Sequence, residues 1–550
     1  MADKTLFASL VGKLIPAADA VNSHGAPAYE LPPKQKLAQY ALTGCMNRTF
    51  YATGADQLQA VLDLANRTDA AFVADLAVYA RKHGHMKDMP ALLCAVLSRM
   101  DGAALKRIFP QVIDNGKMLR NFVQIMRSGV VGRKSLGTLP KGLVAKWLES
   151  ASDAALLDAA TGNSPSLADV LKMTHPKPAS AEREAFYGYV LGKPHNAGAL
   201  PEAVRAYEAY KAYKAYKAYK ACKPDKGVAV GIGAAGAASA GESAQAESPG
   251  VPKVPFQWLT SLDLGQEGWT EVARNAGWQM TRMNLNTFAR HGVFKNREMI
   301  HVIADRLRDP VAVARARVFP YQLLSAFNAA DENVPAAIRE ALQDAMELAI
   351  ANVPAIDGQV YVCPDVSGSM ASPVTGHRKG STTSVRCIDV AALVAAAVLR
   401  KNKDAVVLPF EQDVVKLRLN PRDSVLSNAK ALASIGGGGT NCSAPLAKLN
   451  KEKAKGNLVV FISDNESWVD AGRNRGTATM AQWAIFKDRN PEARLVCIDI
   501  QPYGTTQAKD REDILNVGGF SDQVFTVIAE FAAGRMDGNH WVDRIKGVNG

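Results

Sequence analysis

The chain has 550 residues, which is too long for one ordinary core, because domains of about 100–200 residues are the norm. Its hydrophobic share of 47% and charged share of 21% exclude a wholly disordered or fibrous chain. No uninterrupted apolar run reaches the roughly 20 residues that a membrane span needs. The first twenty residues also lack the continuous apolar centre of a signal peptide. We therefore expect two or three folding units in a cytoplasmic, monomeric protein that contacts no membrane.

The formal net charge is +12, from 65 basic and 53 acidic residues, and this excess is unevenly distributed. Residues 1–356 carry 41 basic and 32 acidic side chains, residues 357–550 carry 24 and 21, and residues 101–150 alone carry 9 and 3. A basic balance of this kind indicates a polyanionic partner. The seven cysteines show no CxxC spacing, so we expect reduced thiols and neither a disulfide framework nor a zinc ribbon.

The first part of the chain reads as one short helix after another. Apolar residues recur at i, i+3 and i+4, and Gly and Pro stand between the periodic stretches. We expect helices at 57–64, 72–79, 90–99, 102–113, 118–127 and 140–149. Helical patterning returns between 256 and 353. This texture predicts antiparallel helices stacked side by side, as in helical-repeat proteins.

A low-complexity segment and a linker interrupt the helical part at 200–255. Residues 205–222 read RAYEAYKAYKAYKAYKAC, and a three-residue period advances about 300° per step on an α-helix. Because the tyrosines then spiral around the helix, we expect a solvated helical spacer, with an RNA-contacting arm as the alternative reading. The Gly-, Ala- and Ser-rich residues 223–255 predict a flexible linker.

The pattern of apolar residues changes at about residue 357. Short apolar, β-branched runs alternate with helical patterns, which predicts parallel strands buried on both faces by helices. We expect strands at 359–363, 405–410, 458–462, 494–500 and 523–527, with a helix at 388–400. The prediction is a multi-domain protein with an all-α helical-repeat module at 1–356 and an open-sheet α/β domain at 357–550.

Hard oxygen donors follow the predicted strands of this α/β domain. Asp365, Ser367 and Ser369 come after the first strand, Thr440 precedes a helix, and Asp464 follows the strand LVVFIS. Ligands of such sheets bind at the carboxyl ends of the strands, and this donor set suits one divalent cation, Mg²⁺ or else Mn²⁺. The plainer alternative is that these side chains cap loops and helices. The arrangement resembles the metal-ion-dependent adhesion site of von Willebrand factor A domains.

The sequence offers no catalytic centre. Neither serine has a partner histidine at a triad position, and DVSGSM differs from the GxSxG elbow of hydrolases. A metal-dependent nuclease is disfavoured, because a single hydroxyl-rich site lacks the paired carboxylates of two-metal cleavage. We expect a protein without catalytic residues.

A basic stretch in the helical part indicates a nucleic-acid surface. Residues 117–146 contain no acidic residue, and the turn MTHPKP at 173–178 adds a histidine and a lysine. Positive side chains that neutralise several phosphates give salt-dependent affinity with little sequence discrimination. The candidate RNA contacts are Arg120, Arg127, Arg133, Lys134, Lys141, Lys146, His175 and Lys177.

The whole order of motifs resembles the Ro autoantigen family, a helical TROVE module followed by a von Willebrand factor A domain, and its bacterial members in particular. The resemblance rests on YALTGCMNRTFYA at 40–52, GRKSLGTLPKGLVAKWL at 132–148, MTHPKP at 173–178, WTEV at 269–272 and RVFPYQLLSAF at 317–327. Only the 200–255 insertion falls outside it. At 157–163, LDAATGN stands where vertebrate relatives carry basic residues, so contacts made by those residues are not carried over.

The resemblance implies a HEAT-like helical ring closed by the A domain. It implies binding of Y RNA on the outer basic surface and of misfolded noncoding RNA by its single-stranded 3′ end. It further implies a role in RNA quality control, with Y RNA tethering a 3′-exoribonuclease such as polynucleotide phosphorylase. The alternative function is a metal-dependent interaction module that recognises an acidic protein partner.

Overall fold

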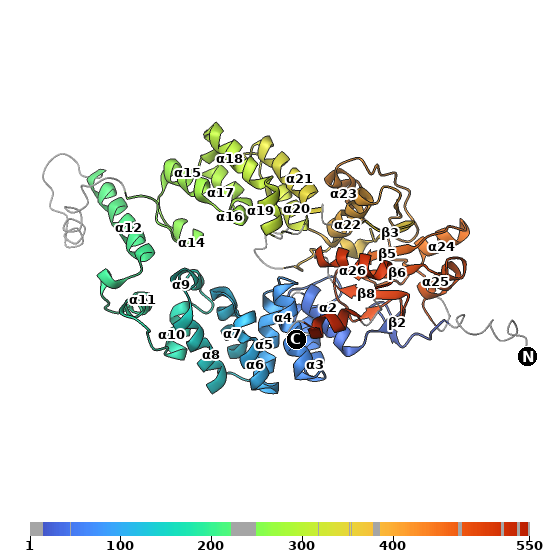
Figure 1. Ribbon diagram of the computed structural model, residues 1–550, viewed down its shortest axis with the longest axis horizontal. Helices are drawn as coiled ribbons and strands as arrows, with labels where there is room; N and C mark the ends of the chain where they lie inside the picture. The colour runs from blue at the N-terminus through green and yellow to red at the C-terminus, as the bar shows by residue number, and fades with distance from the viewer. Residues whose placement is uncertain are drawn as a thin grey trace, which may run out of the picture. The chain divides into compact units, whose positions relative to one another are not determined.

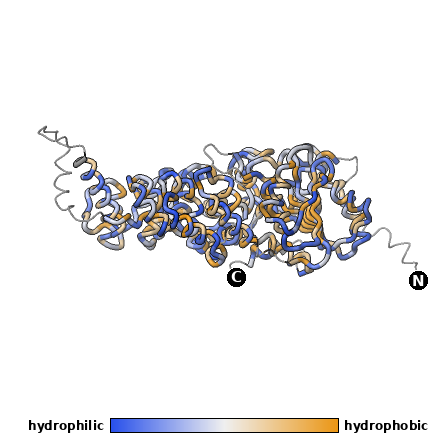
Figure 2. Tube along the Cα trace, turned by 90° about the horizontal axis from the view of Figure 1, so that it is seen from above, coloured by the Kyte–Doolittle hydropathy of each residue, from blue (hydrophilic) through white to orange (hydrophobic). Residues whose placement is uncertain are grey.

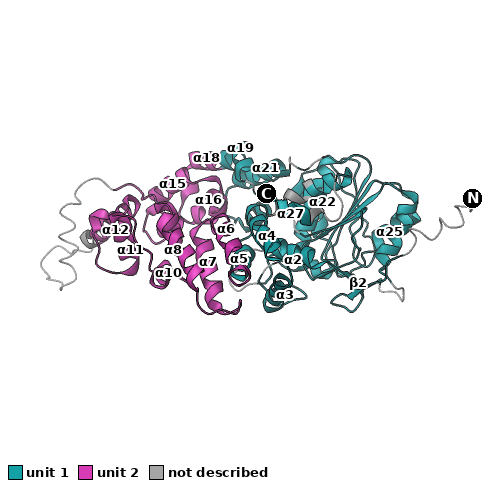
Figure 3. Cartoon of the chain, turned by 60° about the horizontal axis from the view of Figure 1, so that its bottom comes forward, with its two compact units in different colours: residues 1–96, 304–550 teal, residues 97–303 magenta. Residues whose placement is uncertain are grey.

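The computed structural model divides the chain into two compact units, 1–96 with 304–550 and 97–303, which are coloured separately in Figure 3. The described residues are 15–44, 46–221, 249–316, 318, 320–350, 353, 355–377, 385–470, 476–518, 522–535 and 540–547. Of the linker predicted at 223–255, residues 223–248 lie outside the described ranges. Cys45 and Cys222 also lie outside them. No helix in the described ranges is both long and apolar enough to span a bilayer.

A five-stranded parallel sheet forms the centre of the first unit, in the order β4-β3-β5-β6-β8 (Figure 1). The strands are β3 (Val360–Pro364), β4 (Val406–Val407), β5 (Leu458–Ser463), β6 (Arg494–Asp499) and β8 (Ile514–Gly518). Every residue of β3, β5 and β8 is buried, as expected for a sheet covered on both faces. Figure 2 shows this apolar interior as orange trace within a bluer exterior. The α/β domain predicted from the sequence is therefore confirmed.

Helices cover this sheet, and one of them corrects the sequence prediction. Helices α22 (Cys387–Lys401) and α26 (Asp522–Ala532) pack on the strands, and α24 (Ala444–Lys451) and α25 (Ala478–Arg489) share a core with those strands. Helix α23 (Val425–Ala433) packs on α22. The strand expected at 523–527 is wrong, because those residues lie inside α26. Phe525, Ile528 and Phe531 are buried at helical spacing, and the fifth strand is β8 instead. A short apolar run does not distinguish a buried strand from a buried helix.

The N-terminal segment packs on the same domain. Strand β1 (Ala20–Val21) pairs with β2 (Pro27–Glu30), which pairs in turn with β7 (Thr505–Thr506). Helix α2 (Pro33–Thr43) packs beside β8, where a Cβ on Gly518 would lie 2.8 Å from Cγ of Gln39. This part of the chain therefore lies at the carboxyl end of the parallel sheet.

The remaining helices of the first unit agree with the predicted periodicity. They are α3 (Gly54–Asn66), α4 (Ala70–Lys82), α19 (Pro310–Ala316), α20 (Pro320–Ala329) and α21 (Ala336–Ile350), while α5 (Asp88–Met100) and α18 (Arg297–Leu307) cross the unit boundaries. Thr53 and Asp56 form a capping box at the start of α3. Helices α20 and α21 pack on α22 and α23 respectively, so residues from both ends of the helical part contact the α/β domain.

The second unit consists of short helices. They are α6 (Gly102–Val112), α7 (Gly116–Ser128), α8 (Thr138–Ser150), α9 (Asp153–Ala159), α10 (Leu167–Thr174), α11 (Ala181–Leu191), α12 (Glu202–Ala221), α14 (Phe256–Leu259), α15 (Gly265–Asn275), α16 (Trp278–Met283) and α17 (Leu285–Arg290). Helices two apart in the chain pack together, as α6 does with α8, α7 with α9 and α15 with α17, and α10 contacts α7, α8 and α11. The predicted series of packed helices is therefore confirmed.

The Tyr–Lys segment forms helix α12, but its first half is not solvated as we expected. Tyr207 and Tyr210 are buried, and the Tyr207 ring packs edge-on against Trp258. Lys211 and Lys214 lie over the rings four residues earlier, with Nζ 5.3 and 6.0 Å from the ring centroids. Although the tyrosines spiral around α12, the rings of Tyr207 and Tyr210 near its beginning are therefore both buried.

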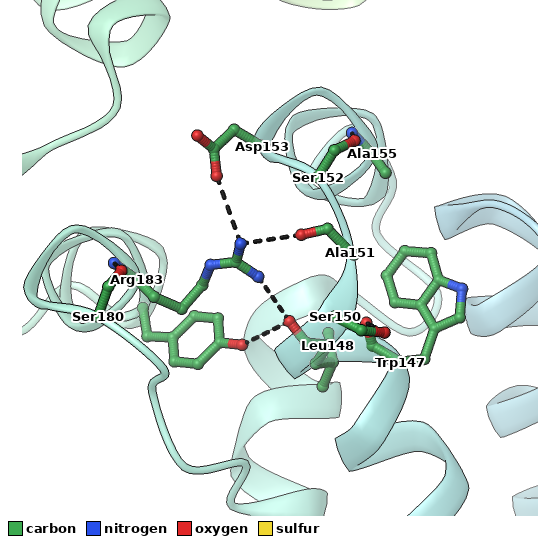
Figure 4. A network of polar contacts seen from close by, with 10 residues as sticks. Trp147, Leu148, Ser150, Ala151, Ser152, Asp153, Ala155, Ser180 and Arg183 are labelled. Carbon is green, nitrogen blue, oxygen red and sulfur yellow. Dashed lines mark hydrogen bonds and ion pairs between the residues drawn. The ribbon is translucent and has the colours of Figure 1, made fainter.

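One guanidinium group holds the end of α8 in place (Figure 4). Arg183 on α11 donates to the carbonyl oxygens of Leu148 at 2.7 Å and Ala151 at 2.8 Å, and it pairs with Asp153 at 3.4 Å. The Tyr187 hydroxyl donates to the same Leu148 carbonyl at 3.0 Å. These donors satisfy carbonyl groups that the end of a helix leaves without partners.

We expect Arg183→Ala to lower the free energy of unfolding by about 2–3 kcal/mol, because hydrogen bonds to charged groups each contribute roughly 1.5–3 kcal/mol. Arg183→Lys keeps the charge but cannot reproduce the planar fork, so it should recover less than half of the loss. Urea denaturation followed by circular dichroism measures this, with the exposed Lys193→Ala as the matched control. Equal stability of the Ala and Lys variants with the wild type would contradict this role.

Candidate functional site

The first candidate site is built at the carboxyl end of β3. Asp365 directly follows this strand and accepts hydrogen bonds from the Ser367 backbone at 2.8 Å and the Ser463 hydroxyl at 2.6 Å. The hydroxyls of Ser367 and Ser369 lie 3.3 Å apart. The turn after β3 thus gathers one carboxylate and two hydroxyls.

Asp464 enters from the adjacent strand, β5. It accepts a hydrogen bond from the Glu466 backbone at 3.3 Å. Because β3 and β5 are parallel neighbours, their carboxyl ends meet at one edge. The two predicted aspartates are therefore brought together.

Thr440 arrives through the glycine loop 436–439. Gly437 and Gly438 have φ values of +127° and +72°, which residues other than glycine rarely adopt. The Gly437 N–H donates to the Val366 carbonyl at 3.1 Å, and the Gly368 N–H donates to the Gly438 carbonyl at 3.2 Å. These bonds tie the loop to the turn that carries the serines.

All five predicted metal ligands are buried, with relative exposures between 0% for Asp365 and 6% for Ser369. Burial raises the pKa of both aspartates above the ordinary 3.8, and each carboxylate adds to the electrostatic cost of ionising its neighbours. In the described residues no Lys or Arg forms an ion pair with either one. Two buried carboxylates beside three hydroxyls are a donor set that fits a hard divalent cation.

Two further carboxylates at this edge were not predicted. Glu466 is buried and accepts from the Ser23 backbone at 2.8 Å, and Asp499 is fully buried at the end of β6. Burial raises the pKa of both groups. Within the described ranges, however, no group of three or more His, Cys, Asp or Glu side chains has a metal-binding arrangement. The sequence signal for Asp499 was its position at the end of a buried strand.

An aromatic cluster beside the metal site was also missed. His24 Nε2 lies 3.1 Å from the Tyr51 hydroxyl, and the Trp468 N–H donates to the carbonyl of the predicted ligand Thr440 at 3.0 Å. The rings of Tyr51 and Tyr503 meet edge-on with centroids 5.0 Å apart, and His24 packs on Trp468 at 5.3 Å. Tyr51 belongs to the motif YALTGCMNRTFYA, but nothing in that motif indicates a position more than 300 residues away in sequence.

The second candidate site is the basic surface on α7, α8 and the turn after α10. Six of its eight predicted residues are exposed, and Arg120 and Arg133 are half-buried. In the described part of the chain none of the eight forms an ion pair. The exposed residues are Arg127, Lys134, Lys141, Lys146, His175 and Lys177.

The Arg120 side chain packs against the protein backbone. A Cβ on Gly162 would lie 1.6 Å from Nη1 of Arg120, so the guanidinium packs directly against the backbone after α9. Burial lowers the pKa of Arg120, and Asp158 partly opposes that shift. Its Nε is buried without a hydrogen-bond partner in the structure. The guanidinium therefore helps to shape the 158–162 turn.

The loop between α7 and α8 is held in shape. Arg99 donates to the Val131 carbonyl at 2.9 Å, and the side chain of Lys134 lies across Gly129, which has a φ of +88°. The exposed lysines on this loop and on α8 therefore extend from a fixed backbone.

The turn after α10 presents His175 to solvent. His175 ends the helix in the left-handed conformation, with a φ of +50°, and its N–H donates to the Leu171 carbonyl at 2.9 Å. The Lys177 N–H donates to the Glu149 carboxylate at 3.2 Å. The backbone is thus anchored to α8, while both side chains remain exposed.

Comparisons with known proteins agree with this architecture. Residues 359–532 match the family model of the Ro60 vWA domain. The chain is 25% identical over 546 residues to the RNA-binding protein RO60 of Deinococcus radiodurans, covering 94% of this chain and 95% of that protein. The crystal structure of the Deinococcus radiodurans RO (RSR) protein matches with a TM-score of 0.58 and 22% identity, over 92% of this chain and 100% of that one. The resemblance to the Ro family is thereby confirmed: residues 359–532 form a von Willebrand factor A domain of the Ro60 type, in a chain similar to a Ro60 protein over nearly its whole length.

Proposed function

We propose that this protein binds RNA through the basic surface of its second unit and has no catalytic role of its own. The observation that carries the proposal is the group of six exposed basic side chains on α7, α8 and the loops beside them. No acidic residue lies between 117 and 146. Unpaired lysine and arginine side chains on a fixed backbone neutralise phosphates without selecting bases. The name of the Deinococcus relative supports the same class of ligand.

The RNA that we propose is Y RNA, together with misfolded noncoding RNA that offers a single-stranded 3′ end. His175 adds a ring that can stack on an unpaired base or donate to a phosphate. The ring-shaped helical module and the Y RNA tether to polynucleotide phosphorylase belong to this proposal through the family resemblance.

The proposal includes one divalent cation, Mg²⁺ or Mn²⁺, held by Asp365, Ser367, Ser369, Thr440 and Asp464. A cation there would offset the charge of two buried carboxylates that form no ion pair with any Lys or Arg among the described residues. Its role in this proposal is structural, because a single hydroxyl-rich site lacks the paired carboxylates that two-metal phosphodiester cleavage uses.

We expect the triple variant Lys141→Ala, Lys146→Ala, His175→Ala to bind a Y RNA at least tenfold more weakly than the wild type. Because two phosphate contacts are lost, the slope of log K against log salt should become shallower by about 1.4–1.8. Filter binding at several salt concentrations measures both quantities. Lys193→Ala with Lys253→Ala removes the same formal charge from exposed positions outside the surface and should bind as the wild type does.

Equal RNA affinity of the triple variant and this control would refute RNA binding by the basic surface. Rapid cleavage of labelled RNA by the pure protein with Mg²⁺ would refute the non-catalytic role.

We expect the affinity for Mn²⁺ to rise with pH well above 3.8, because metal ligation requires ionised carboxylates and burial raises the pKa of Asp365 and Asp464. The same raised pKa values predict that the free energy of unfolding of the metal-free protein falls as the pH rises through them, because the unfolded chain releases these protons at lower pH. Calorimetry between pH 5 and 8 measures the affinity. Asp365→Asn should abolish binding, and the exposed Asp404→Asn should leave it intact. A pH-independent affinity would contradict the assignment.

A further inference from the structure

Strand β4 forms one edge of the parallel sheet, and its outer side carries backbone groups without partners. The Leu408 N–H donates to the Val362 carbonyl at 2.8 Å, so the backbone of Leu408 faces β3. Because neighbouring residues of a strand direct their backbone groups to opposite sides, the N–H and C=O of Val407 point to the free edge. In the described part of the chain neither group has a hydrogen-bond partner.

The chain after β4 turns back along this edge but pairs with it only briefly. The Val415 N–H donates to the Pro409 carbonyl at 2.8 Å, which closes a short hairpin. Continued antiparallel pairing would join Leu417 to Val407. Instead, residues 416–419 make no backbone hydrogen bond with any described residue. The hairpin therefore opens after Val415 and leaves unbonded backbone on both of its arms.

The opened hairpin and α24 enclose a groove, which we call the edge groove. It is lined by residues 406–408, 412–418 and the exposed side of α24, with a volume of about 1280 Å³. Sites for small molecules have roughly 300–1,000 Å³. Apolar side chains contribute to the lining: Val406 is 40% exposed, and Val415 and Leu417 are partly exposed. This size and this lining suit a length of polypeptide.

The charge of the edge groove is positive. Its two acidic side chains, Asp413 and Glu452, are outnumbered by four basic ones, which are Lys416, Arg418, Lys448 and Lys451. Lys448 forms an ion pair with Glu452, whereas the other three basic side chains are exposed and form no ion pair within the described ranges. Like charges would oppose pairing with the same edge of a second copy, and an acidic segment would be attracted. Among the described lining residues none is aromatic, so the groove offers no ring on which RNA bases could stack.

We propose that the edge groove binds an extended acidic segment of a partner protein. The segment lies against the opened hairpin as an added strand, and its backbone bonds to Val407 and to residues 416–419. Its carboxylates face Lys416, Arg418 and Lys451. Strand addition of this kind takes affinity from the main chain and specificity from the side chains. The inference goes beyond RNA binding, and it depends neither on the metal ligands, none of which lines the groove, nor on the second unit.

The test uses the full chain and a fluorescent peptide of four Glu-Val repeats, with affinity from anisotropy and hydrogen exchange read at residues 407 and 416–419. These amides should exchange rapidly in the free protein and slowly with the peptide, because new hydrogen bonds protect them. Lys416→Glu with Lys451→Glu should weaken the peptide at least tenfold. Lys403→Glu with Lys455→Glu makes the same charge change at exposed positions outside the groove and should bind as the wild type does. Both double variants should keep the RNA affinity of the wild type.

Two further probes separate strand addition from attraction by charge alone. The same peptide methylated on alternate backbone nitrogens keeps its carboxylates but loses main-chain donors, so it should bind at least tenfold more weakly; equal binding would overturn the added strand. A labelled ten-uridine RNA should not protect these amides, and protection that the Lys416→Glu, Lys451→Glu variant abolishes would assign the groove to RNA instead. Unchanged exchange at 407 and 416–419 with millimolar peptide would also overturn the proposal, and would leave RNA binding by the second unit and the metal site untouched.

Discussion

The burial of two carboxylates at one edge of a parallel sheet is the constraint on which the first unit depends. Asp365 and Asp464 follow adjacent strands and are almost completely shielded from water. Removing an ionised carboxylate from water is costly unless a partner charge or a proton compensates. The Ser463 hydroxyl and the Ser367 N–H donate hydrogen bonds to Asp365 but carry no charge, so burial keeps the pKa of both carboxyl groups raised.

This constraint explains why distant parts of the sequence form one unit. The N-terminal part of the chain packs on the α/β domain through three contacts: β2 pairs with β7, α2 packs on β8, and Arg48 forms a β-bridge with His377. The Ser23 backbone donates to Glu466 at 2.8 Å, which satisfies one more buried carboxylate at the same edge. Residues near position 20–51 therefore contribute directly to the electrostatics of a domain that begins some 300 residues later.

The sequence predicted that the five candidate ligands would lie together, and the structure does bring them to one edge of the sheet. Each follows or precedes a buried strand or helix, and the topology of a parallel sheet then determines that they meet. Tyr51 and Ser23 could not be predicted in this way, since they reach the site through long-range packing of the N-terminal segment. The strand β8 was missed because ILNVG carries a polar Asn516 that hydrogen-bonds inside the domain, to the Ala508 carbonyl at 2.8 Å and to Asp510 at 2.7 Å. The more continuous apolar run that follows it forms a helix.

Positive charge in the second unit serves two purposes, and only the structure separates them. Arg120 and Arg183 are as basic as their neighbours, but one guanidinium packs on the backbone at Gly162 and the other caps α8. Arg127, Lys141 and Lys146 stand exposed on the helices that this packing fixes. A count of basic residues therefore overestimates the charge available to a polyanion. The buried guanidiniums still matter to binding, because they hold the backbone from which the exposed side chains extend.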